Sequence, residues 1–77
     1  MENMTVEEVR TRLMATSEEF RRLAEKHANY DRRIEELASR RFPSQEEQTE
    51  EARLKKMKLH LKDQMTHMVQ EYAHHPA

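Results

Sequence analysis

The chain has 77 residues and a mass of 9.4 kDa, with no Gly, no Cys, no Trp and only 2 Pro. These counts exclude disulfide frameworks, thiolate metal sites and the Gly-rich loops that cradle phosphates. The 14 Lys and Arg against 15 Asp and Glu give a net charge of -1, so no overall field selects nucleic acid or membrane. With 38% charged residues and much Leu, Met and Ala, the composition predicts an all-α fold in a single domain over residues 1–77.

The first predicted helix covers about residues 5–41. Thr5 with Glu8 forms a capping box, in which each side chain accepts a hydrogen bond from the other residue's backbone N–H. Apolar or aromatic residues then follow at spacings of three and four, and only Thr16 and His27 interrupt them. This sustained repeat predicts one continuous helix with a left-handed, coiled-coil-like seam.

A turn at about residues 42–44 separates this helix from a second one over about residues 44–73. Pro43 removes a backbone donor and disfavours the α conformation at Phe42, so the first helix has to end nearby. Ser44 and Glu47 form a second capping box. Because the connection is short, the two helices should lie antiparallel as an α-hairpin.

The apolar stripe of the second helix has spacings of 3, 4, 4, 3 and 4, closer to a straight helical face than to a strict heptad. Two helices alone cannot bury both stripes, so we expect a homodimer or homotetramer, or a partner helix docked on the exposed stripe. The expected interaction seam consists of Val9, Leu13, Phe20, Leu23, His27, Tyr30, Ile34, Leu37, Leu54, Met57, Leu61, Met65 and Met68.

Basic residues cluster over residues 53–62 of the second predicted helix, and they have two interpretations. In one, they contact phosphates of a nucleic acid, which makes the chain an accessory nucleic-acid-binding protein. In the other, they form a solvated face that pairs with Glu25, Asp31 and Glu35 of the first helix. The candidate phosphate contacts are Lys55, Lys56, Lys58 and Lys62.

The histidines also allow alternatives. His27, within the seam, is either a pH-sensitive switch or a histidine hydrogen-bonded to Asp63 or Gln64. His60, His67 and His74 recur every seven residues, about 10.5 Å apart along a helix, too far for one metal ion within a single chain. We therefore predict no metal site and no cofactor.

Leu59 lies away from the main stripe, so it is either a scattered exposed leucine or part of a second contact face. The carboxylates of the chain have no predicted cleft around them, so an enzyme is not expected. No segment is apolar enough to span a membrane, and residues 1–10 show no leader pattern, which predicts a cytoplasmic protein.

Three motifs occur in order: Phe20-x-x-Leu23, His27-x-x-Tyr30-Asp31-x-x-Ile34, and L-K-K-M-K-L-H-L-K-D over residues 54–63. Together they resemble the YdcH-like family of short bacterial proteins of unknown function, over about Phe20 to Tyr72. The sequence departs from that family at Gln64, where an acidic residue is common, and at Met65, where Ile is usual. The resemblance implies a helical hairpin and a bacterial, cytoplasmic origin, and it implies no activity.

Overall fold

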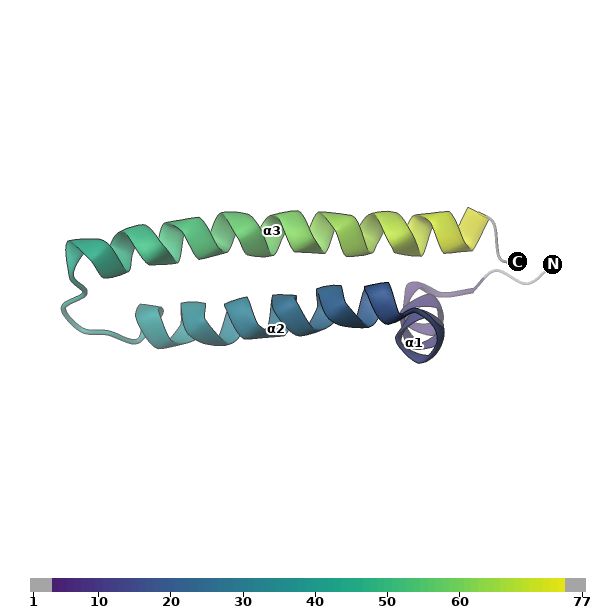
Figure 1. Cartoon of the computed structure of the whole chain (residues 1–77), viewed down its shortest axis with the longest axis horizontal. Helices are drawn as coiled ribbons and strands as arrows, with labels where there is room; N and C mark the ends of the chain where they lie inside the picture. Colours follow the sequence, from purple (N-terminus) through teal and green to yellow (C-terminus); the bar gives the residue numbers. More distant parts are fainter. Residues whose placement is uncertain (1–3, 75–77) are drawn as a thin grey trace.

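The chain folds into three α-helices (Figure 1). The computed structural model describes residues 4–74, and within them the helices are α1 (Val6–Thr16), α2 (Glu18–Ala38) and α3 (Gln45–His74), with no strand. Helices α2 and α3 lie side by side and antiparallel, whereas α1 turns across the end of this pair that lies away from the 39–44 connection. The prediction of an all-α fold is confirmed.

The prediction of one continuous helix over residues 5–41 is wrong, because the helix is interrupted at Ser17. Ser17 has extended backbone angles (φ -114°, ψ 112°), and its hydroxyl accepts a hydrogen bond of 3.1 Å from the backbone N–H of Phe20. Glu18 and Glu19 follow in the first turn of α2, where negative charge favours a helix start. The Arg21 guanidinium donates to the carbonyl of Met14, which satisfies an acceptor at the end of α1 (3.0 Å).

The break brings the apolar face of α1 onto the other two helices. Val9 and Leu13 pack with Phe20 of α2 and with Met65 and Val69 of α3 into one buried cluster. Of the large side chains, Phe20, Leu37 and Val9 are the most completely buried, and Phe20 has no exposed surface. Because the Ser17 N-cap starts a new helix, α1 folds back and covers the end of the α2–α3 pair.

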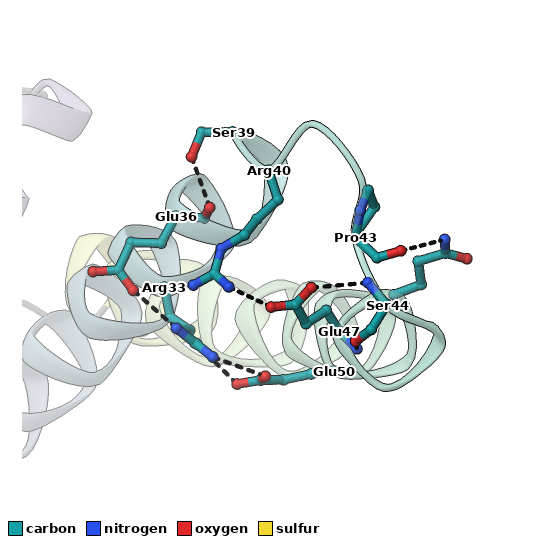
Figure 2. A network of polar contacts seen from close by, with 9 residues as sticks. Arg33, Glu36, Ser39, Arg40, Pro43, Ser44, Glu47 and Glu50 are labelled. Atoms are coloured by element: carbon teal, nitrogen blue, oxygen red, sulfur yellow. Dashed lines mark hydrogen bonds and ion pairs between the residues drawn. The ribbon is translucent and has the colours of Figure 1, made fainter.

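Both predicted capping boxes are confirmed. In the first, Thr5 and Glu8 exchange hydrogen bonds of 2.8 and 3.1 Å. In the second, the backbone N–H of Ser44 donates to Glu47 (2.8 Å), and the N–H of Glu47 donates to the Ser44 hydroxyl (3.1 Å; Figure 2). Helix α2 ends at Ala38 rather than at about residue 41, and Ser39 caps it by donating its hydroxyl to the Glu36 carbonyl.

The inward face of α3 contains polar as well as apolar side chains, so a pattern of apolar residues alone misses part of it. The fully buried residues are Leu54, Leu61, Met65 and Val69. The half-buried residues are Glu47, Glu50, Glu51, Lys58, Met68 and Tyr72. Lys58 takes the place expected for Met57, whose side chain is 40% exposed.

The apolar core is divided. One cluster lies under α1, and a second consists of Ile34, Leu37 and Leu54, with Tyr30 packed against it. Leu61 is buried between the two clusters at 8% exposure. Val69, buried in the first cluster, was not among the expected seam residues.

The cluster near the connection should be sensitive to cavity formation. Leu37→Ala removes a side chain that is 1% exposed and is expected to lower the free energy of unfolding by about 2–5 kcal/mol. Leu59→Ala, at an α3 position that is 59% exposed, should change it by less than about 0.5 kcal/mol. Urea denaturation followed by circular dichroism measures both values. Equal effects of the two variants would contradict this description of the core.

Candidate functional site

One face of the α2–α3 pair contains two shallow hollows between the helices. Their volumes are about 380 and 310 Å³, and Gln64 lines both. The first is lined by Lys26, Tyr30, Lys56, Met57, His60, Leu61 and Gln64, and the second by Glu19, Leu23, Asp63, Gln64, His67 and Met68. These residues define the α2–α3 groove.

Helical spacing explains why these side chains share one face. On α2 the lining residues Glu19, Leu23, Lys26 and Tyr30 are separated by four, three and four positions, so they form a single stripe. On α3 the lining residues from 56 to 68 follow the same periodicity. The groove thus lies along the margin of the packed face and shares four residues with it: Leu23, Tyr30, Leu61 and Met68.

The floor of the groove is apolar. It comprises five side chains from the two helices: Leu23, Tyr30, Met57, Leu61 and Met68. Leu61 is buried, Leu23, Tyr30 and Met68 are half-buried, and Met57 is exposed. Four of these five therefore still present apolar surface to solvent, and three of the four, Leu23, Tyr30 and Met68, also pack against the core.

The rim of the groove has opposite charges at its two ends. Glu19 and Asp63 lie in the hollow nearer α1, and Lys26 and Lys56 lie in the hollow nearer the connection. All four side chains are exposed. The groove therefore has an acidic end and a basic end of equal formal charge.

A polar layer separates the two apolar clusters at mid-length. The Lys58 ammonium of α3 donates to the Asp31 carboxylate of α2, as expected for a basic face paired with the first helical segment. This hydrogen bond holds the pKa of Asp31 below its ordinary value of 3.8, although desolvation opposes it, and the charges of Lys58 and His27 act in the same direction as the bond. His27 is half-buried, and none of the hydrogen bonds within residues 4–74 joins it to Asp63 or Gln64.

At the end of the pair near the 39–44 connection, Arg33 of α2 and Arg40 of the connection pair with glutamates of α3 (Figure 2). Arg33 donates Nε and Nη2 to the two oxygens of Glu50 at 3.0 and 3.1 Å, a bidentate geometry, and donates Nη1 to Glu36 at 3.1 Å. Arg40 pairs with Glu47, which also belongs to the capping box of α3. These contacts raise the pKa of Arg33 and lower the pKa of Glu50.

The structure places the expected seam residues mainly inside the chain. Val9, Leu13, Phe20, Ile34, Leu37, Leu54, Leu61 and Met65 are buried, and Leu23, His27, Tyr30 and Met68 are half-buried. The seam thus joins the helices of one chain. Five of the expected seam residues also line the groove: Leu23, Tyr30, Met57, Leu61 and Met68. Sequence reasoning missed the groove because its residues are recognisable only once α2 and α3 are in register.

The four lysines proposed as phosphate contacts do not gather into one free cationic patch. Lys58 pairs with Asp31, Lys55 pairs with Glu51 at 3.2 Å, and Lys56 lies on the rim of the groove. Lys62 is exposed. Glu25 and Glu35 form no ion pair with the basic segment within residues 4–74, so of the three predicted acidic partners Asp31 alone is observed there.

The histidines of α3 lie in different surroundings. His60 lines the basic half of the groove, and His67 lies 3.6 Å from Glu71 and lines the acidic half. Within residues 4–74 no group of three His, Asp or Glu side chains is arranged to hold a metal ion. None of the three helices has the length and apolarity to cross a membrane, as judged over the same residues.

The lowered pKa values predict a loss of stability in acid. Asp31 and Glu50 have lower pKa values folded than unfolded, so the unfolded chain binds more protons as the pH falls. The stabilisation should be complete above pH 4.5, the ordinary pKa of Glu50, and should decline as the pH falls further through the folded-state values. Asp31→Asn combined with Glu50→Gln should flatten this decline in urea denaturation at several pH values. Glu46→Gln, at an exposed position, is the matched control, and an equally steep decline in the double variant would contradict the assignment.

Comparison with known proteins adds one finding. Neither the curated proteins nor the solved structures gave a match. The family model for a protein of unknown function, DUF465, matches residues 20–69, which covers most of α2, the connection and most of α3. The YdcH-like resemblance is thereby confirmed, because the YdcH family is part of DUF465. Since the match includes well over half of the sequence, the chain belongs to the DUF465 family of proteins of unknown function.

Proposed function

We propose that the protein is a small non-enzymatic interaction module that associates with a second copy of itself through the α2–α3 groove. The observation that carries the proposal is the apolar floor of the groove, to which both helices contribute. Stable domains usually consist of at least two packed layers, whereas α2 and α3 form one layer that α1 covers only at one end. A second α2–α3 pair laid on the groove face supplies the missing layer.

The rim charges favour a second copy over an unrelated helix. When one copy is reversed end to end, the acidic end with Glu19 and Asp63 faces the basic end with Lys26 and Lys56. A two-fold axis across the groove produces this reversal, and a two-fold interface uses the same surface on both partners. Two acidic and two basic side chains make the surface complementary to itself.

Introducing a charge into the floor should weaken this association. Met57→Glu places a carboxylate on the floor, where the second copy would desolvate it without a partner. The dimer dissociation constant should rise at least about tenfold, which corresponds to about 1.4 kcal/mol. Sedimentation equilibrium or light scattering over a range of concentrations measures this change.

The matched control is Leu59→Glu, which adds the same charge two residues away and outside the groove. It should leave the dissociation constant close to that of the unchanged protein. A protein that remains monomeric at every concentration would contradict the proposal and leave the groove free for another partner. Equal weakening by both variants would place the interface elsewhere.

Charge reversal at the rim offers an independent test. Lys26→Glu with Lys56→Glu makes the rim wholly acidic, and Glu19→Lys with Asp63→Lys makes it wholly basic. Each variant alone should be monomeric, because like charges meet across the interface, whereas an equimolar mixture should form a heterodimer. If the two variants fail to combine, or if each still forms a homodimer, the rim does not govern association.

A further inference from the structure

A second surface of the molecule is covered only by α1. At the end of the α2–α3 pair, Phe20, Met65 and Val69 form an apolar surface, and Val9 and Leu13 of α1 bury it. We call the three residues from α2 and α3 the end surface. It lies beyond the groove floor, although Leu23 and Met68 border both.

The attachment of α1 is narrow. Val9 and Leu13 are its only buried residues, and they are one helical turn apart. This is the pattern by which an amphipathic helix docks in an apolar groove of a separate partner. A helix of 11 residues is also marginal by itself in water, so its docking stabilises its helical form. In its contacts, α1 resembles a bound peptide.

The junction between α1 and α2 is suited to opening. Ser17 alone separates the two helices, and neither Gly nor Pro is present there. The apolar spacing of the seam continues without a slip from Leu13 through Thr16 to Phe20, so a continuous helix is compatible with the same sequence. The Ser17 cap on Phe20 and the Arg21 bond to the Met14 carbonyl hold the broken form.

The extent of the family match separates α1 from the rest of the chain. The matched segment begins at Phe20, so all of α1 and the Ser17 junction lie outside it, whereas the end surface lies within it. The match therefore covers the end surface and most of the α2–α3 pair but no residue of α1.

We propose that the end surface is a helix-docking site that α1 of the same chain occupies in the closed form and that α1 of a second copy occupies after exchange, with Ser17 as the hinge. The second copy is the occupant because the Val9–Leu13 face is the complement that the surface already holds. Exchange keeps these apolar contacts and transfers them between chains, which is a low-cost route to a dimer. This proposal is independent of the α2–α3 groove.

A labelled peptide tests whether the surface binds α1 in trans. The peptide spans residues 4–17, and the receptor is the full chain with Val9→Asp and Leu13→Asp, whose own α1 can no longer dock. Fluorescence anisotropy should show binding to this receptor at least about tenfold tighter than to the unchanged chain, whose own α1 competes for the surface.

The control peptides separate apolar docking from non-specific association. A peptide with Val6→Asp, at a position 62% exposed, should bind like the parent peptide. A peptide with Val9→Asp and Leu13→Asp should not bind. If the parent peptide fails to bind a receptor whose α2–α3 pair remains folded by circular dichroism, the proposal is overturned.

A second experiment keeps the test valid if the receptor variant does not fold. In chains that also carry Met57→Glu to weaken the groove interface, Ser17→Ala removes the cap and permits a continuous helix. Glu18→Pro instead places Pro at the first position of α2 and disfavours the α conformation at Ser17, so it fixes the break.

The Ser17→Ala chain should then self-associate at least about tenfold more tightly than the Glu18→Pro chain in sedimentation equilibrium. Equal solution masses for the two chains over the same concentrations would overturn the exchange proposal. Because both carry Met57→Glu, this result does not depend on whether the groove associates, so failure of one proposal is distinguishable from failure of the other.

Discussion

The antiparallel register between α2 and α3 is the constraint on which the other features depend. Two ion pairs between the helices fix it, Arg33 with Glu50 and Lys58 with Asp31, and Arg40 of the connection adds a third with Glu47. Exposed ion pairs contribute little stability individually, so burial of the two apolar clusters supplies most of the free energy. The pairs act mainly on alignment, because a shifted register separates these charges. Only in this register do residues of both helices line one groove.

Local signals in the sequence were sufficient for much of the fold. The capping boxes at Thr5 and Ser44 define helix starts by interactions within a few residues, and the structure contains both as expected. Pro43 signals the connection, although α2 ends earlier, at Ala38. The break at Ser17 also has a local signal, a serine followed by two glutamates. It competed with an apolar repeat that runs through the same residues, and sequence alone does not show which of the two prevails. The end surface decides the outcome, since its residues come from distant parts of the chain.

Polar residues at inward positions explain the remaining differences. Lys58 is half-buried in α3 and its ammonium meets Asp31 of α2, whereas a pattern based on apolar residues selects Met57 for this position. Met57 is instead 40% exposed and lines the groove. Self-association was expected through the seam itself. In the structure, most seam residues pack between the helices of one chain, so the proposed contact between two copies is formed by the α2–α3 groove instead.

The division of the core also has a consequence for motion. Apolar contacts lie in two clusters, and the layer between them contains Asp31, Lys58 and the half-buried His27 beside the buried Leu61. Packing therefore couples residues more strongly within each cluster than across the middle. Such a molecule opens in parts, with one cluster loosening while the other stays packed. Amide hydrogen exchange would then proceed at one rate around Phe20 and Met65 and at another beside Leu37 and Leu54, so that one short chain contains two levels of local stability.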